Sequence, residues 1–170
     1  KKIVTSGCGQ GTVFGDIMEE VSGKKMPPPT IASGTITTSH LQSLLKKISL
    51  TPSLYLRAGA IHGCALAIGD EPKIYMEDVG RHNAVDKISG YMRQHQIIGA
   101  DKIFYTTGRL TSEMVIKCLL MDIPILVSRN GFTLFAVELA RAAGMTMIAR
   151  ARGERFVVAA GRERVIFDNA

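Results

Sequence analysis

Cys8 has the surroundings in this sequence that best suit group transfer. It lies in the segment SGCGQG (residues 6–11), where glycines on both sides leave the thiol accessible and the backbone free to move. A thiol that takes a group from one partner and gives it to another needs both properties, because its sulfur must reach a donor and then an acceptor. We therefore interpret Cys8 as a candidate transfer thiol; the alternative is an incidental loop cysteine.

Arginines follow four of the expected strands, at the points where the strands end. They are Arg81, Arg109, Arg129 and the group Arg150, Arg152 and Arg155. Ligands of open α/β sheets bind outside the carboxyl ends of the strands, where helix N-termini add N–H donors. Arginine forks match phosphate oxygens, so this pattern predicts a cationic rim for a ligand with several phosphates. The alternative is that these side chains are solvated or pair with Asp and Glu.

The densest polar cluster is GRHNAVDK (residues 80–87). Its His82 is a candidate ligand or proton-transfer group, and its Asn83 is a candidate helix N-cap; an ordinary turn leading into a helix is the alternative. The segment TGRLTSE (residues 107–113) resembles a phosphate turn, with a Thr111 cap and the Ser112 hydroxyl near Arg109. Neither GxxxxGK[ST] nor GxGxxG after a strand is present, which disfavours Walker-type and Rossmann binding.

The remaining cysteines indicate neither a disulfide framework nor a zinc site. Cys64 and Cys118 lie in apolar segments, so we expect both to be buried and inert. A zinc deaminase needs H-x-E or C-x-E followed by P-C-x-x-C. His62 is followed by Gly63 and Cys64, the glutamate is missing and no PCxxC occurs. We therefore expect no zinc.

Strands and helices that alternate along the chain must position these residues. Apolar segments typical of buried strands lie at 59–69, 73–79, 102–106 and 124–128 and from 146, with short closing strands at 156–158 and 165–167. Segments with helical spacing begin near 40 and cover 83–95, 111–121 and 133–143. In the first helix, Ser39 is the expected N-cap and the buried face is Leu41, Leu44, Leu45 and Ile48. This alternation predicts βαβ units and a mostly parallel sheet.

The first 35 residues differ from the rest. Residues 5–12 (TSGCGQGT) are small and polar, and three prolines at 27–29 exclude a helix there. We predict a flexible arm over 1–35 that carries the Cys8 loop and leads into an α/β domain over 36–170. The chain begins with Lys1 rather than Met, so we expect an N-terminal segment to be missing.

Composition places the chain among globular proteins of one domain. It has 170 residues, 46% of them hydrophobic, and a net charge of +6. No apolar run is long enough to span a bilayer and no signal peptide is visible, so we expect a cytoplasmic protein without a membrane partner. Nucleic-acid binding would rest on the charge and the arginines alone, and aromatic residues for base stacking are sparse at 6%. We expect no nucleic-acid partner.

Four segments resemble the FdhD/NarQ family of formate dehydrogenase accessory sulfurtransferases. They are EDVGRHNAVDK (residues 77–87), TGRLTSEMV (107–115), PILVSR (124–129) and FAVELA (135–140). The resemblance runs from about residue 5 to 165. It implies a three-layer, cytidine-deaminase-like α/β sandwich without the zinc. The family has a CGxCG-like loop whose first cysteine matches Cys8, whereas the second position is Gly11 here.

The resemblance also implies a function. A persulfide on Cys8 would carry sulfur from a cysteine desulfurase to the molybdenum or tungsten bis(molybdopterin guanine dinucleotide) cofactor, for which a guanine nucleotide is a mimic, before formate dehydrogenase receives it. The family's cofactor-binding stretch falls on Arg150, Ala151, Arg152, Gly153, Glu154 and Arg155. From the arginine rim and the polar cluster described above, we expect Arg81, His82, Asn83 and Arg109 to help hold the cofactor. A homodimer is expected because the cofactor is roughly two-fold. The alternative is a non-catalytic chaperone that binds the cofactor or a guanine nucleotide.

Overall fold

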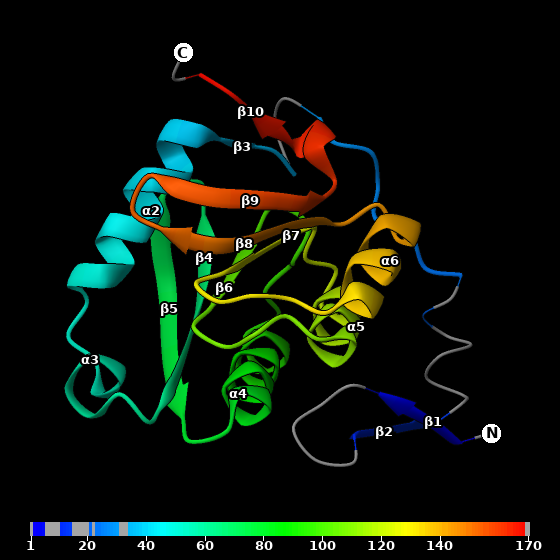
Figure 1. The fold of residues 1–170 in the computed structure, drawn as a ribbon, viewed down its shortest axis with the longest axis horizontal. Helices are drawn as coiled ribbons and strands as arrows, with labels where there is room; N and C mark the ends of the chain where they lie inside the picture. Colours follow the sequence, from blue (N-terminus) through cyan, green and yellow to red (C-terminus); the bar gives the residue numbers. More distant parts are fainter. Residues whose placement is uncertain (1, 6–10, 15–20, 22, 31–33, 169–170) are drawn as a thin grey trace.

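The computed structural model describes residues 2–5, 11–14, 21, 23–30 and 34–168 of the chain. In this part, the largest sheet has the strand order β5-β4-β6-β7-β8-β9 (Figure 1). Its strands are β4 (His62–Ile68), β5 (Glu71–Asp78), β6 (Ile103–Thr106), β7 (Ile125–Ser128), β8 (Thr146–Arg152) and β9 (Arg155–Ala160). All of them were predicted from the sequence, with somewhat different ends.

Two strands of this sheet, β4 and β9, are antiparallel to their neighbours because each belongs to a hairpin. β4 and β5 are joined by a short turn and so are β8 and β9, and such connections make neighbouring strands antiparallel. β4 also pairs antiparallel with β6, while β6, β7 and β8 pair in parallel through helical connections. β5, β6, β7 and β8 therefore share one direction, which confirms the mostly parallel sheet.

Helices cover both faces of the sheet (Figure 1). α2 (Thr38–Leu50) packs on one face, and α4 (Arg81–Gln94), α5 (Ser112–Leu120) and α6 (Leu134–Ala142) pack on the other. Side chains alternate along the strands, so Phe104 and Leu126 belong to the α4–α6 core while Ile103 and Tyr105 belong to the α2 core. The three-layer α/β sandwich is confirmed.

The start of α2 corrects one prediction. Its apolar face is buried as expected, but Thr37 is the N-cap, accepting a hydrogen bond from the backbone N–H of His40 at 3.1 Å. Ser39 lies inside the first turn, and its backbone N–H donates to Asp168 Oδ1 at 2.9 Å. The chain is extended at Thr37 because β3 (Ile36–Thr37) pairs with β10 (Val165–Ile166), which makes Thr37 the last residue before the helix. A five-residue helix, α3 (Leu54–Ala58), follows α2.

The described part of the first 35 residues contacts the domain. Val21 and Met26 are buried in the α4–α6 core, although this stretch was expected to lie outside it. Arg164, at the end of a short 3-10 helix (Arg162–Arg164), is 2% exposed and donates to the backbone oxygens of Gly34 at 3.1 Å, of Gly144 and of Pro27. This buried guanidinium ties the segment before α2 to the turn between α6 and β8.

A small hairpin precedes these residues. β1 (Lys2–Thr5) pairs antiparallel with β2 (Gly11–Phe14). Cys8 belongs to the connection between these strands and lies outside the described residues, as does the flexibility predicted for its loop. No helix in the described ranges is both long and apolar enough to cross a membrane.

Candidate functional site

Two tightly bonded turns form the centre of the carboxyl edge of the sheet. They follow β6 and β7, the parallel strands in the middle. The Ser128 hydroxyl donates to the backbone oxygen of Gly108 at 2.6 Å, and the Asn130 side chain donates to the backbone oxygen of Thr107 at 2.5 Å. These bonds hold Arg129, between Ser128 and Asn130, at a fixed place on the edge.

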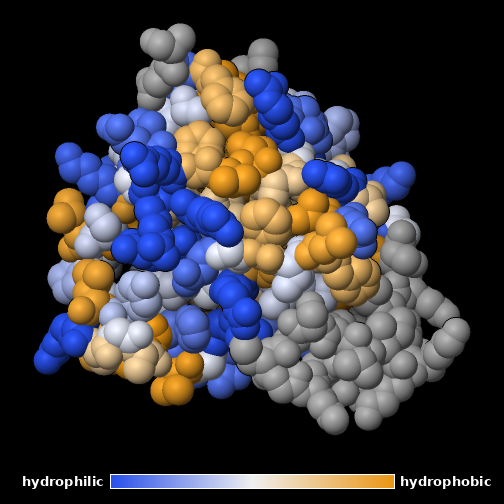
Figure 2. Space-filling model, viewed as in Figure 1, coloured by the Kyte–Doolittle hydropathy of each residue, from blue (hydrophilic) through white to orange (hydrophobic). Residues whose placement is uncertain are grey.

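A groove of about 550 Å³ opens on the α2 side of these turns. One wall is the polar face of α2, formed by Ser39, Gln42, Ser43, Lys46 and Ser49. The other wall is Arg129 with the β8–β9 turn, residues 151–154, and Tyr105 also lines the groove. A hydrophilic patch covers the β8–β9 turn in Figure 2, next to a more apolar surface. Three cationic side chains therefore line a cavity of the size of a small-molecule site.

The β8–β9 turn orients its arginines through backbone conformation. Arg152 donates from Nε to the backbone oxygen of Arg129 and from Nη2 to Asn130 Oδ1, both at 3.3 Å. Gly153 has φ +58°, which a residue with a side chain rarely adopts, and so allows the tight turn. Arg150 also has a positive φ, 52°, where the β8–β9 register shifts, and it lines a second, adjoining pocket with Arg129 and Arg152.

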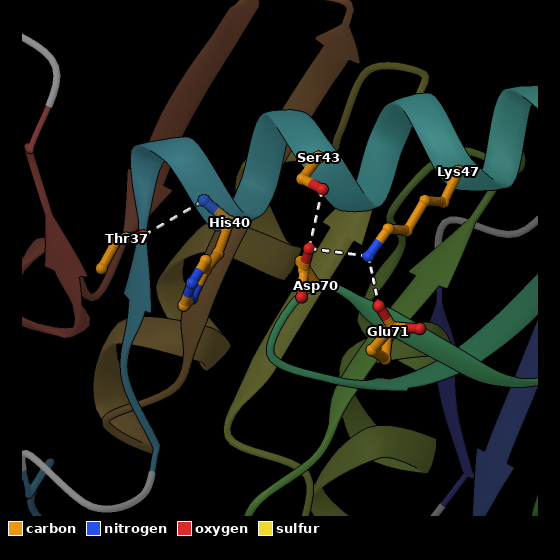
Figure 3. Close-up of polar contacts among 6 residues, drawn as sticks. All are labelled: Thr37, His40, Ser43, Lys47, Asp70 and Glu71. Atoms are coloured by element: carbon orange, nitrogen blue, oxygen red, sulfur yellow. Dashed lines mark hydrogen bonds and ion pairs between the residues drawn. The ribbon is translucent and has the colours of Figure 1, made fainter.

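α2 is held against the sheet by an ion-pair network (Figure 3). Lys47 Nζ and Ser43 Oγ each lie 2.7 Å from Asp70 Oδ2, and Lys47 also contacts Glu71. The hydrogen bonds from Lys47 and then Ser43 lower the pKa of Asp70 to about 2. Because Asp70 and Glu71 lie at the β4–β5 turn, the network fixes the helix that forms one wall of the groove.

On the other face of the sheet, α4 and α5 begin side by side. His82 Nε2 lies 2.9 Å from Glu113 Oε2, and Lys117 Nζ lies 2.7 Å from Asp86 Oδ1. Each contact joins the two helices, and the second is four residues further along both of them. The helices are therefore parallel and in register, and both N-termini lie at the carboxyl edge.

Arg81 lies at this junction of helix N-termini. A Cβ added to Gly108 would come within 3.0 Å of Arg81 Cβ, so the arginine stem packs directly on the turn after β6. Its Nε and Nη2 atoms are buried and have no hydrogen-bond partner among the described residues. The same holds for the hydroxyls of Thr111 and Ser112, whose residues are 1% and 0% exposed.

Two histidines near Arg81 are harder to protonate than a free imidazole. Burial first, and then the charge of Arg81, lower the pKa of His62 and of His82. The lowered pKa favours the uncharged form of His82, and in this form its contact with Glu113 is not an ion pair. Over the described ranges, no group of three or more His, Cys, Asp or Glu side chains is arranged to hold a metal ion.

Comparison with known proteins identifies the family. The model of the FdhD/NarQ family matches residues 1–166. The chain belongs to the FdhD/NarQ family. It is 32% identical over 167 residues to "Sulfur carrier protein FdhD" of Geobacillus kaustophilus and 33% identical over 155 residues to the protein of that name from Wolinella succinogenes. It covers 62% and 52% of these two relatives, so it spans between about half and two thirds of their length.

A solved structure supports the same assignment. A crystal structure from Desulfotalea psychrophila, described as a formate dehydrogenase accessory protein, superposes with a TM-score of 0.74 and 32% identity. The match covers 85% of this chain and 62% of that one. The fold described above is therefore that of an FdhD/NarQ protein.

The arginines of the predicted cationic rim of this FdhD/NarQ chain lie in two separate places, and residues 150–155 occupy the first of them. Ala151, Arg152, Gly153 and Glu154 line the groove, and Arg150 lines the adjoining pocket. Arg155 is exposed at the start of β9. Contrary to expectation, Arg150 and Arg152 do not follow β8, because the strand continues through a bulge to Arg152.

The other predicted residues gather at the α4 and α5 N-termini. Arg81 and His82 are partly buried there, whereas Asn83 and Arg109 are exposed. Asn83 is not the N-cap of α4: the helix begins earlier, after Gly80, and Asn83 Nδ2 donates to Asp78 Oδ1 at 3.2 Å. The role of each residue in binding stays a prediction.

Cys64 and Cys118 are fully buried, as predicted. Burial raises the pKa of Cys64 to about 12 and that of Cys118 further still, so neither forms a thiolate near neutral pH.

The groove wall on α2 was missed at the sequence level. Its polar residues Ser39, Gln42, Ser43 and Lys46 have the spacing i, i+3, i+4, i+7, which is one face of a helix. The apolar face of the same helix predicted the core, and no role was assigned to its polar face. Nothing in the spacing alone says that a polar helix face lines a groove.

Proposed function

We propose that this chain carries sulfur from a cysteine desulfurase to the molybdenum or tungsten bis(molybdopterin guanine dinucleotide) cofactor, and so acts as a sulfurtransferase in the maturation of formate dehydrogenase. Two relatives named sulfur carrier proteins and a structural neighbour described as a formate dehydrogenase accessory protein support the role. The observation that carries it is the groove in which Arg129 and Arg152 face the polar side of α2.

The groove suits a phosphorylated nucleotide arm of the cofactor, which is the substrate here. Arg129, Arg152 and Lys46 supply positive charge for phosphate oxygens. The hydroxyls of Ser39, Ser43 and Ser49 on α2 already donate to protein oxygens, so they offer acceptors for polar edges. At about 550 Å³ the groove has room for one arm rather than the whole cofactor. The adjoining pocket at Arg150 extends the cationic surface beyond it. A homodimer would supply a second such groove for the second arm.

In this proposal sulfur is transferred in two steps, first to Cys8 and then to the cofactor. Cys8, as a thiolate, attacks the outer sulfur of the desulfurase persulfide; a new S–S bond forms, the old one breaks, and the desulfurase cysteine leaves as a thiolate. In the second step the S–S bond of the Cys8 persulfide breaks and Cys8 returns to a thiolate. The transferred sulfur takes two electrons from the reduced metal of the cofactor and becomes a sulfide ligand.

Mass spectrometry tests the carrier role directly. The chain is incubated with a cysteine desulfurase and L-cysteine, and its intact mass is measured without reductant. We expect an adduct of one sulfur atom in the wild type and in Cys64→Ala, whose thiol is buried, and none in Cys8→Ala. Absence of the adduct from the wild type, or its persistence in Cys8→Ala, contradicts the assignment.

Gly11 favours a second candidate function. The family's second loop cysteine is replaced by this glycine, so a role that needs no persulfide is the alternative: a chaperone that binds the cofactor or a guanine nucleotide. Tight binding of guanosine diphosphate together with no sulfur adduct would select it.

A further inference from the structure

We propose that the adjoining N-termini of α4 and α5, with Arg81, form a second anion site that binds a phosphate-sized oxyanion. This site is separate from the groove, because α4 and α5 cover the opposite face of the sheet from α2. It does not depend on the proposed sulfur transfer, and it would remain if Cys8 carried no sulfur.

The first step of the argument is the capping of the helices. α2, α3 and α6 are capped by the side chains of Thr37, Ser53 and Thr133. At α4 the cap is Gly80, which has no side chain, and at α5 the Thr111 hydroxyl makes no capping bond. Two helix N-termini without a capping side chain therefore meet at one place, and such ends attract anions.

Buried polar atoms at the same place supply the second, independent observation. Thr111 and Ser112 are at least 99% buried, and their hydroxyl oxygens have no hydrogen-bond partner in the part of the chain that the structure describes. Buried polar groups in native proteins almost always have partners, so hydroxyls left without one point to a ligand. Both hydroxyls lie at the start of α5, at the junction with α4.

Arg81 determines the kind of ligand. Its unpartnered atoms, Nε and Nη2, lie on one edge of the guanidinium, and this edge donates two parallel hydrogen bonds to a pair of oxygens on one anion. The stem is fixed by its packing on Gly108, so the edge is preorganised. A ligand with at least two oxygens and negative charge fits these donors.

The charges around the junction favour an anion over a cation. Burial first, and then the positive charge of Arg81, lower the pKa of His62 and of His82, so the charge of Arg81 acts on both rings. Of the nearby carboxylates, Asp78 at the start of α4 is paired with Lys87, Asp86 is paired with Lys117, and Glu113 lies against His82 at 2.9 Å. An oxyanion would give Arg81 the partner that the described protein groups do not provide.

The test is a titration of the chain with inorganic phosphate, followed by amide NMR. We expect saturable shifts at the first turns of α4 (residues 81–83) and α5 (residues 112–114), and an affinity at least tenfold lower in Arg81→Gln. Arg93→Gln is the charge-matched control, because Arg93 is exposed at the far end of the same helix and should bind phosphate like the wild type. Ser112→Ala is the second variant, should Arg81→Gln fail to fold, and should also weaken binding.

Two results would overturn the proposal. One is the absence of phosphate-dependent shifts in the wild type at the two helix starts. The other is phosphate binding that survives in Arg81→Gln or Ser112→Ala but is lost in Arg152→Gln, which would assign the anion to the groove.

Repeating the titration with saturating guanosine diphosphate distinguishes the source of the oxyanion. If the diphosphate blocks phosphate binding at the helix starts, the site holds a phosphoryl group of a nucleotide. If it does not, the site takes free phosphate. Either result is compatible with the site itself.

Discussion

The two sides of the carboxyl edge present arginine in different surroundings. On the α2 side, Arg152 is exposed and its guanidinium already has protein acceptors at Arg129 and Asn130. On the α4–α5 side, Arg81 is partly buried and two of its nitrogens have no acceptor among the described residues. Only a few strand-end residues separate the two environments. An exposed arginine retains its water and suits a large, charged ligand, whereas a desolvated arginine suits a small ligand of matching shape.

The largest effect is expected in the groove. Replacing Arg152 with Gln removes a charge-assisted hydrogen bond to a phosphate, so guanosine diphosphate should bind about 10- to 100-fold more weakly. Because the groove is open, binding should also weaken as salt is raised. Calorimetry at two salt concentrations measures both, with Arg93→Gln as control. Equal affinity of Arg152→Gln and wild type would place the nucleotide elsewhere.

A second prediction concerns stability in phosphate-free buffer. Arg81→Met removes buried donors that lack partners and keeps the apolar stem, so it should raise the free energy of unfolding by about 1 kcal/mol. Arg152→Met removes an exposed side chain and should change it by less than about 0.5 kcal/mol. Urea denaturation of the two variants measures the difference. If Arg81→Met is the less stable of the two, Arg81 has a structural role that outweighs its lack of partners.

A third prediction follows from the lowered pKa of His82. The folded protein resists protonating this ring, so its contribution to stability is full above the unfolded value of 6.5 and falls as the pH drops below it. Sulfate, which does not titrate in this range, should raise the pKa of His82 if it binds beside Arg81. The charges of Glu113, Lys117 and Asp86 also act on the ring and are unchanged by sulfate. NMR titration of the ring proton with and without sulfate decides the point.

The smallest effect is expected at the network that holds α2. The pKa of Asp70 is lowered to about 2, so its ion pair contributes stability that is full above about 3.8 and is lost as the pH falls toward 2. Asp70→Asn should abolish that dependence and lower the melting temperature slightly at neutral pH, because the pair is close to the surface. Melting curves of wild type and Asp70→Asn at pH 7 and at pH 3 measure the loss of melting temperature at each pH. A loss at pH 3 as large as the loss at pH 7 would show that Asp70 has a role beyond its ion pair.

The elements could be predicted from sequence because their signals are local. The alternation of buried strands with helices of helical spacing placed β6, α5, β7 and α6 nearly to the residue. Cys64 and Cys118 were correctly expected inside for the same reason, since they lie within apolar segments.

The sites could be predicted only in part because they depend on contacts between distant segments. The direction of the strands predicted that Arg81 and Arg152 lie at the same edge of the sheet. That they lie on opposite faces of the sheet depends on which helix covers each face, and the sequence alone does not show this. The cap at Gly80 was missed because Asn83 is the better capping residue and is held by Asp78 instead. The bulge that keeps Arg150 within β8 has no signal in residue types alone.

The burial of Val21 has a kinetic consequence for the thiol that precedes it. Val21 is 2% exposed in the core, and Cys8 lies 21 − 8 = 13 residues before it. Thirteen residues span at most about 45 Å, so the covalent chain limits how far Cys8 can be from Val21. A thiol confined in this way has an effective concentration on the order of millimolar at sites within its reach. If Cys8 carries sulfur as proposed, its delivery to a cofactor bound at the sheet edge would be unimolecular and insensitive to dilution of the protein.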